Sequence, residues 1–192
     1  MFANRSIHFE SPQIRSLPVA DGDRIEVAAL THQADLARCK VLFIDYDDWV
    51  AAHLYEHGFV IDSPARTKAF IELQAPKLLT GAGGVYVAFL DGRRVGVLAL
   101  SEVSADAAEV TRLYVSGLDR RRGVARELLE RVIKDARSLG YRTLQARVLS
   151  FMTDARPAHE AVGFRQKQQL DELTTLMELE LWTFRDCEMR SS

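Results

Sequence analysis

AEVTRLYVSGLDRRRGVAR, residues 108–126, contains a strand, a basic loop and the start of a helix. The first eight residues are rich in β-branched and aromatic side chains and predict a strand over 108–115. Apolar residues then recur at helical spacing over 123–139 and form one stripe, which predicts an amphipathic helix. The loop between them ends in three arginines and Gly123.

This loop has the features of an anion site. A helix N-terminus presents unpaired N–H donors and about half a positive charge from the helix dipole. Gly123 has no side chain, so a ligand can approach the backbone closely. We therefore predict a cradle suited to phosphate. The alternative is a solvated arginine cluster, but arginines at this end of a helix oppose the dipole. The loop lacks both the P-loop signature and the three-glycine dinucleotide fingerprint.

Charge is distributed unevenly along the chain. The 192 residues have a formal net charge of −2, with 25 basic and 27 acidic side chains. Residues 117–147 hold nine basic and four acidic side chains, so this segment is +5 and the remainder is −7. Positive charge concentrated around one helix start indicates a local anionic ligand.

Hydrophobic periodicity predicts one mixed α/β domain over 24–183, with an N-terminal arm over 1–23 and a tail over 184–192. The predicted strands cover 24–29, 85–90, 94–103, 108–115, 143–150, 164–169 and 175–182. The predicted helices cover 33–50 after a Thr31 cap, 63–79 with Ser63 at the N-cap, 123–139, and a segment from Thr153 or Asp154 to 162.

Several protein classes are excluded or disfavoured by composition. The 47% hydrophobic content is that of a globular chain, and there is no run of about 18 apolar residues to span a membrane. The N-terminal stretch lacks the apolar core of a secretory signal, so we expect a cytoplasmic protein. Cys39 and Cys187 fit no metal or disulfide framework, and we expect no metal.

Residues 120–125, RRRGVA, resemble the Arg/Gln-x-x-Gly-x-Gly/Ala motif of the GCN5-related N-acetyltransferases (GNAT). The resemblance extends to the preceding strand, to MTDARPAHEAVGF (152–164), which is similar to the late helix ending in Gly-Phe, and to LMELEL (176–181) as the final strand. It covers about 85–182, with a weaker similarity over 24–50. It implies a mostly antiparallel sheet of six to seven strands, about four flanking helices, and a bulge that splays one strand pair at the coenzyme site.

The resemblance implies acetyl-CoA as cosubstrate. Amides of residues 121–126 would hold the pyrophosphate, Arg120 or Arg122 would reach phosphates, and residues 113–115 would pair with the pantetheine arm. The coenzyme-binding residues expected on this basis are Leu113, Tyr114, Val115, Arg120, Arg121, Arg122, Gly123, Val124, Ala125 and Arg126.

Acetyl transfer needs a group that deprotonates the amine and a donor to the thioester oxygen. Glu109 lies eleven residues before Arg120, at the spacing of a catalytic Glu in histone-type members, and is our candidate base, acting directly or through water. The alternative is an exposed carboxylate. The family's usual oxyanion donor is a backbone N–H near Tyr114 and Val115.

His159 is our candidate acid, because it lies four residues before Gly163, where many members have Tyr. An imidazole can donate to a thiolate or hold a water, and the alternative is a structural replacement. Pro157 and Asp154 also depart from the family pattern.

The acceptor amine is expected near the first two helices, with Tyr46 and Trp49 as its binding residues. Asp47, Asp48 and three further aromatic or histidine side chains lie close in sequence, and such a lining suits a cationic amine. The alternative is that the aromatic residues belong to the core and the aspartates are solvated. A metal at His53 and His57 lacks a third ligand.

The leading function is acetyl transfer from acetyl-CoA to a primary amine of a small molecule or peptide, by direct attack in a ternary complex. The alternative is a non-catalytic acyl-CoA-binding regulatory domain of the same fold. Binding of nucleic acid is disfavoured by the pI of about 6.2, and we expect neither nucleic acid nor membrane as a partner. A homodimer is possible.

Overall fold

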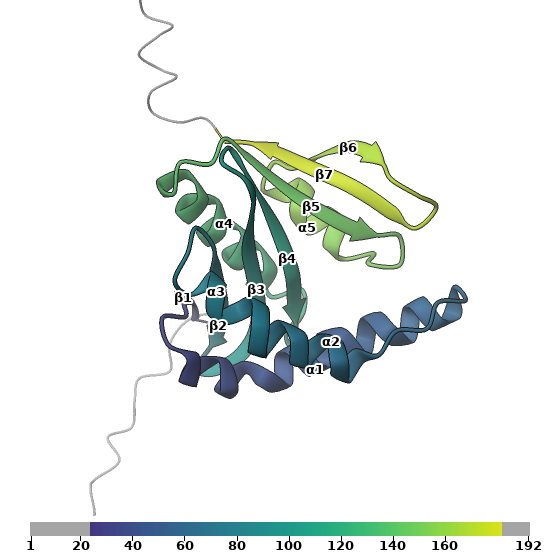
Figure 1. Cartoon of the computed structure of the whole chain (residues 1–192), viewed down its shortest axis with the longest axis horizontal. Helices are drawn as coiled ribbons and strands as arrows, with labels where there is room; N and C mark the ends of the chain where they lie inside the picture. Colours follow the sequence, from purple (N-terminus) through teal and green to yellow (C-terminus); the bar gives the residue numbers. More distant parts are fainter. Residues whose placement is uncertain (1–23, 182–192) are drawn as a thin grey trace, which may run out of the picture.

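The computed structural model describes residues 24–181, which form one seven-stranded sheet with helices on both faces (Figure 1). The strand order is β1-β2-β3-β4-β5-β7-β6, and β4–β5 is the parallel pair. The strands are β1 (Ile25–Ala29), β2 (Gly84–Leu90), β3 (Arg93–Ser104), β4 (Ala107–Val115), β5 (Thr143–Leu149), β6 (Arg165–Gln169) and β7 (Thr174–Glu180). The mixed, mostly antiparallel sheet confirms the predicted fold class.

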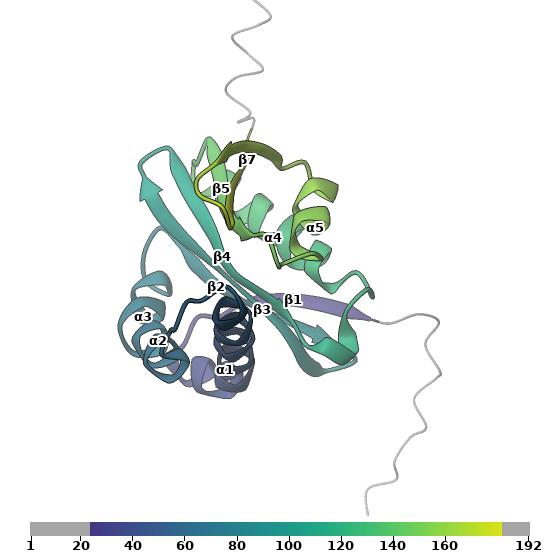
Figure 2. The ribbon, with the colours of Figure 1, turned by 90° about the vertical axis from the view of Figure 1, so that its right-hand side faces the viewer.

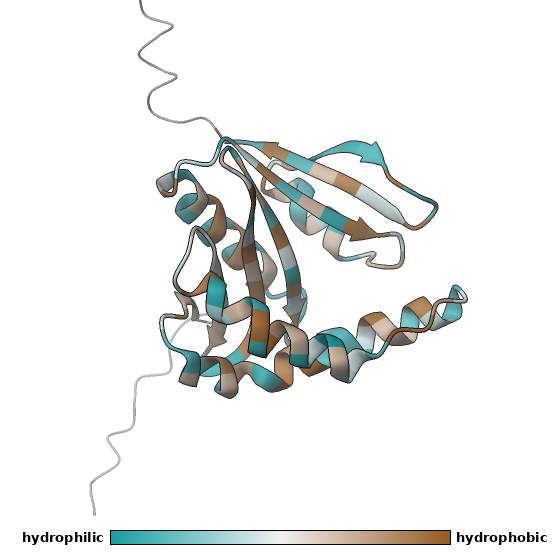
Figure 3. Ribbon diagram, in the orientation of Figure 1, coloured by the Kyte–Doolittle hydropathy of each residue, from teal (hydrophilic) through white to brown (hydrophobic). Residues whose placement is uncertain are grey.

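The helices divide between the two faces of the sheet, as Figure 2 shows. One face is covered by α1 (Gln33–Glu56), α2 (Ser63–Ala69) and α3 (Ala75–Leu78), and the other by α4 (Val124–Ser138) and α5 (Ala155–Ala161). Alternate residues of the central strands therefore enter two cores. Val85 and Val87 pack with α1, whereas Tyr86 and Ala88 pack with α4. Apolar residues are correspondingly concentrated on the central strands (Figure 3).

A bulge in β4 shapes the centre of the sheet. Val97 of β3 pairs with Tyr114 and Ala99 pairs with Thr111, so β4 contains one extra residue between these pairs. Arg112 lies in that bulge with φ +53°, a left-handed conformation that is uncommon for a residue with a side chain. The pairing of β4 with β5 ends at Val110. Beyond this point the two parallel strands diverge, as Figure 1 shows, so the splayed pair expected from the resemblance is present.

The first helix begins at Gln33, as predicted, but its predicted C-terminal end was wrong. It continues to Glu56 instead of ending at 50, because no helix breaker precedes Gly58, which has φ +81°. Its N-cap is His32 rather than Thr31.

The second predicted helix has a different cap and is interrupted. Asp62, not Ser63, is its N-cap, and the Asp62 carboxylate accepts from the Ala65 amide at 2.8 Å. The π-helical segment Phe70–Gln74 then divides it before Pro76, whose missing N–H cannot continue the regular helical ladder. At α5 the N-cap is Asp154, without a side-chain capping bond.

The predicted arm over 1–23 and tail over 184–192 lie outside the described residues. Between residues 24 and 181, no helix has the length and apolar content needed to cross a membrane.

Candidate functional site

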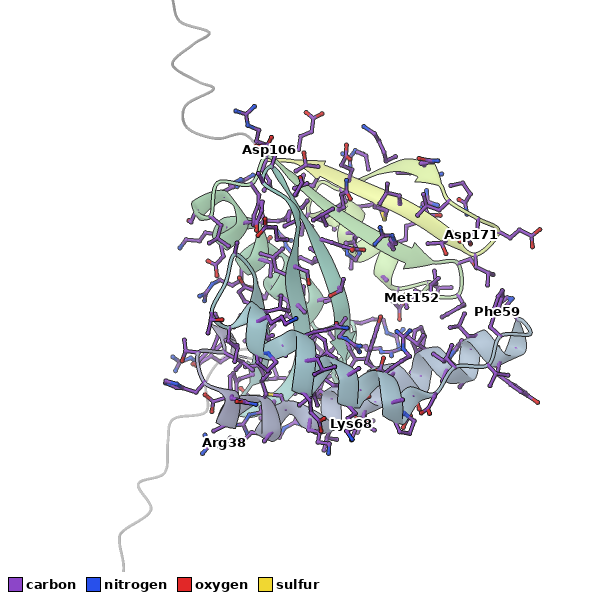
Figure 4. All side chains as sticks on the ribbon, viewed as in Figure 1. Arg38, Phe59, Lys68, Asp106, Met152 and Asp171 are labelled. Atoms are coloured by element: carbon purple, nitrogen blue, oxygen red, sulfur yellow. The ribbon has the colours of Figure 1, made fainter. Side chains whose placement is uncertain are left out.

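Two cavities meet at the splay between β4 and β5. The first, of about 370 Å³, lies beside the loop before α4 and is called the cradle cavity. The second, of about 500 Å³, lies between β4, β5 and α2 and is called the splay cavity. Four residues line both: Tyr46, Leu113, Met152 and Ala155. Met152, labelled in Figure 4, lies on the loop after β5 and faces the gap toward α1. A ligand in each cavity would therefore meet the other at these four residues.

The loop before α4 has the backbone shape of an anion cradle. Arg121 and Gly123 both have left-handed φ angles, of +59° and +88°, and Gly123 is the N-cap of the 15-residue α4. This geometry turns successive amides toward one side, where the positive end of the helix dipole adds to them. A Cβ at Gly123 would meet Ile25 Cδ1 at 3.7 Å, so the backbone angle, not crowding, is what requires glycine.

The predicted coenzyme-binding residues mostly surround the cradle cavity. Its wall includes Leu113, Tyr114, Val115, Arg120, Arg121, Gly123, Val124, Ala125 and Arg126. Arg122 instead donates from Nη1 to Asp119 Oδ1 at 3.4 Å, and Arg93 donates to the same oxygen at 3.0 Å. Because Asp119 is only 3% exposed, this hydrogen bond directs the Arg122 side chain toward the protein.

Arg120 joins three elements at the edge of the cradle cavity. Its Nε donates to the Val115 carbonyl at 3.2 Å, and its Nη1 lies 3.9 Å from Asp154 Oδ2 at the start of α5. Its guanidinium also lies 5.7 Å from the ring centroid of Trp49 on α1 and 5.9 Å from that of Tyr114. A phosphate bound here would compete with Asp154 for Arg120. Asp154 departs from the family pattern, and it places a negative charge beside a site proposed for polyphosphate.

Glu109 lines the splay cavity from β4, before the bulge. Its side chain is 14% exposed, and its Oε1 accepts from Arg147 Nη1 at 2.5 Å. Arg147 is the first residue of β5 past the end of the β4–β5 pairing. The carboxylate is therefore open to the cavity and oriented by a guanidinium from the opposite wall.

His159 lines the same cavity from α5 but is 3% exposed. Its Nδ1 lies 2.7 Å from the Ala155 carbonyl, so Nδ1 bears the proton because a carbonyl can only accept. Its buried Nε2 has no hydrogen-bond partner among the described residues. Burial lowers the pKa of the imidazole, although the Ala155 bond acts in the opposite direction. In the resulting neutral form, Nε2 is an acceptor.

Tyr46 and Trp49, the predicted acceptor-binding residues, project from α1 toward the site but occupy different parts of it. Tyr46 lines both cavities, whereas Trp49 lines only the cradle cavity. Burial raises the pKa of the Tyr46 phenol, while Arg112 and Arg66 act in the opposite direction. The Tyr46 hydroxyl therefore stays protonated at neutral pH.

Trp49 belongs to an aromatic cluster that joins α1 to the loop after β5. Its ring centroid lies 5.7 Å from that of Phe151, and the rings of His53 and His57 stack on Phe151 at 5.3 and 5.8 Å. Both histidines are therefore packing partners here. Residues 24–181 contain no group of three His, Cys, Asp or Glu side chains arranged to hold a metal ion.

The predicted acidic lining differs from what the structure places there. Asp47 is fully buried and accepts from Thr67 and Arg112 at 2.7 Å and from Arg66 at 3.3 Å. Asp48 accepts from the hydroxyl of Ser63. Sequence reasoning missed the charged groups that line the splay cavity beside Glu109, namely Arg66, Arg112 and Arg147.

The sequence model of the acetyltransferase (GNAT) family matches residues 60–164, more than half of the chain. No curated protein matches by sequence. PaiA N-acetyltransferase of Thermoplasma acidophilum, solved with coenzyme A, is similar in structure, with a TM-score of 0.65, 18% identity, and coverage of 82% of this chain and 99% of that one. YncA of Salmonella typhimurium, a putative acetyltransferase solved with acetyl-CoA, has a TM-score of 0.60 and 20% identity, with coverage of 82% of this chain and 94% of that one. A GNAT acetyltransferase of Staphylococcus aureus has a TM-score of 0.64 and 15% identity, with coverage of 83% of this chain and 100% of that one.

Proposed function

This chain belongs to the acetyltransferase (GNAT) family, and we propose that it transfers an acetyl group from acetyl-CoA to a primary amine in a ternary complex. The observation that supports this most strongly is the meeting of two cavities at the β4 splay. Direct transfer requires two reactants to be held together at one point, and Tyr46, Leu113, Met152 and Ala155 line both cavities.

The cradle cavity fits the phosphates of the cosubstrate. The amides of residues 121–126 would hold the pyrophosphate at the start of α4, where Gly123 has no side chain to block the ligand. Beyond the bulge, no strand within residues 24–181 pairs with β4 on its β5 side, so the backbone of residues 113–115 can pair with an extended ligand arm. Two structural neighbours were solved with acetyl-CoA or coenzyme A, which is consistent with this assignment.

The thioester of acetyl-CoA supplies the acetyl group, and the chain must accept one proton and stabilise one oxyanion. Glu109 accepts the proton of the amine, directly or through a water, while Arg147 holds its carboxylate in place. A backbone N–H at Tyr114 or Val115 donates to the carbonyl oxygen as negative charge develops there.

Tyr46 is the group best suited to donate a proton to the departing thiolate. It lies where the cavities meet, and burial keeps its hydroxyl protonated. Donation from Nε2 of His159 would require the cationic imidazole, which its burial disfavours. His159 as the acid stays a prediction, and the contacts favour Nε2 as a hydrogen-bond acceptor, for example toward a water.

The test is to mix the protein with acetyl-CoA and a panel of amines, to follow free thiol, and to identify N-acetyl products by mass spectrometry. We expect thiol release that depends on one class of amine. Acetyl-CoA binding without thiol release above background for any amine would contradict the proposal and support the alternative, a non-catalytic acyl-CoA-binding domain. Asp154 beside the cradle and His159 in place of Tyr are the features that favour that alternative.

A further inference from the structure

The splay cavity is rich in guanidinium groups. Arg66 of α2, Arg112 of the β4 bulge and Arg147 of β5 line it, and Glu109 is the carboxylate beside them. A cavity that received a purely cationic amine would place its charge among these three cations, which is unfavourable. The lining therefore points to an acceptor that carries negative charge as well as its amine.

The buried network behind the cavity leaves one positive charge uncompensated. Asp47 is the acidic partner of both Arg112, at 2.7 Å, and Arg66, at 3.3 Å. Arg112 has the shorter contact, is 11% exposed, and lies 4.2 Å from the ring centroid of Phe70. A single carboxylate cannot neutralise two guanidinium groups, so net positive charge remains at Arg66.

Arg66 is also the guanidinium with the freest donors. Its contact to Asp47 uses Nε, its side chain is 44% exposed, and its terminal amino groups have no hydrogen-bond partner among residues 24–181. Paired terminal N–H groups of arginine match the two oxygens of a carboxylate. Arg147, in contrast, is engaged with Glu109, and that pair is neutral as a unit.

We propose that the acceptor is an amine that also bears a carboxylate or similar acidic group, as in a free amino acid, and that Arg66 binds that acid while Glu109 faces the amine. This inference rests on the proposed acetyltransferase function and specifies its substrate class. It replaces the cationic acceptor expected from sequence, because Asp47 is already paired with Arg66 and Arg112 and does not face a substrate.

The test compares amino acids with their α-carboxamides, which keep the amine and side chain but lack the negative charge. Thiol release is measured for each pair with the wild type, Arg66→Gln and Arg66→Lys. Arg38→Gln, at an exposed position of α1, is the matched control. We expect the wild type to prefer the acid at least about tenfold in kcat/KM. Intrinsic reactivity would favour the carboxamide, because its amine loses a proton more easily, so such a preference has to come from binding.

In Arg66→Gln we expect KM for the acid to rise about ten- to a hundredfold with little change in kcat, and KM for the carboxamide to stay the same. Arg66→Lys should recover part of the loss because it keeps the charge, and Arg38→Gln should behave as wild type. Equal or faster acetylation of carboxamides by wild type would overturn the acidic acceptor and leave the proposed function standing. Equal losses for both members of a pair in folded Arg66 variants would also overturn it. Failure of every amine, with acetyl-CoA bound, would overturn the proposed function and this inference with it.

Discussion

Nη1 of Arg112 lies 2.7 Å from Oδ2 of Asp47, and this contact joins the bulge of β4 to helix α1. Asp47 is fully buried, and Thr67 of α2 donates to the same oxygen at 2.7 Å. Arg112, whose backbone is left-handed, is thus bound through its side chain to α1, and α2 contributes a donor to the same carboxylate. Because the bulge separates β4 from β5, this buried pair is coupled to the shape of both cavities.

Asp47→Asn should lower the free energy of unfolding by about 3–5 kcal/mol, because it leaves Arg112 buried without its counter-charge. The measurement is urea unfolding followed by circular dichroism. Asp35→Asn is the control, since Asp35 forms an exposed pair with Arg38 three residues away, worth at most about 1 kcal/mol. If the two variants lost the same small amount, the Asp47 network would not hold the bulge.

Gly123→Glu should abolish acetyl-CoA binding, because it places a negative side chain beside the amides proposed to hold the pyrophosphate. Gly123→Ala should weaken binding less, since its Cβ has room and the cost comes from the left-handed φ. Affinity is measured by isothermal titration calorimetry with acetyl-CoA.

Gly92 provides matched controls for both changes. It has φ +81° in the turn between β2 and β3, and a Cβ at this position would have no neighbouring atom within 4 Å. Gly92→Ala and Gly92→Glu should cause similar backbone strain without altering acetyl-CoA affinity. Unchanged affinity in Gly123→Glu, or an equal loss in Gly92→Glu, would remove the loop from the binding site.

Much of this fold was predictable, because local patterns and tertiary packing agree. The stripe of α4 and the continuous apolar runs of β2 and β3 correspond to residues that are buried. The bulge was taken from resemblance, yet the sequence contains a signal for it. Ala108 and Val110 face the α4 core at even positions, whereas Leu113 and Val115 face it at odd positions. One extra residue between 110 and 113 is what such a change of phase requires.

The acceptor side of the site was harder to predict, because it depends on contacts between residues far apart in sequence. Asp47 looked like an exposed carboxylate, but Arg112 reaches it from 65 positions away. Arg66 and Arg147 line the same cavity only because the fold brings α2 and β5 close to β4. A cradle on one contiguous loop can be recognised locally, whereas the charge of a cavity assembled from three elements cannot.

His159 should make stability depend on pH in the mildly acidic range. Burial lowers its pKa below the unfolded value of about 6.5, so the neutral form is favoured in the folded protein. Its contribution is complete above about pH 6.5 and is lost as pH falls through the lowered value, at up to about 1.4 kcal/mol per pH unit. Urea unfolding of His159→Gln between pH 7.5 and 5 should show a shallower decline than wild type. The exposed His32, changed to Gln, should keep the wild-type slope. Identical slopes in all three proteins would refute the assignment.

Glu109→Gln should lower kcat by about 10²–10⁴ if Glu109 accepts the amine proton. The loss should be greatest at low pH, where more of the amine is protonated, and should shrink as pH rises. Initial rates of thiol release from pH 6 to 9 give the profile. Glu102→Gln on the exposed end of β3 is the control and should match wild type. A Glu109→Gln profile parallel to that of wild type would exclude Glu109 as the base.

Tyr46→Phe keeps the ring where the cavities meet and removes its hydroxyl. If the hydroxyl donates to the departing thiolate, kcat should fall about a hundredfold while acetyl-CoA affinity stays the same. The loss should be constant from pH 6 to 9, because burial raises the phenol pKa above its usual value and keeps the donor protonated in wild type throughout. Tyr55→Phe, at a tyrosine that is 73% exposed on the same helix, is the control for loss of a hydroxyl. Full activity in Tyr46→Phe, together with a large loss of kcat in His159→Gln at unchanged acetyl-CoA affinity, would transfer the donor role to His159 and show that its Nε2 is protonated during turnover.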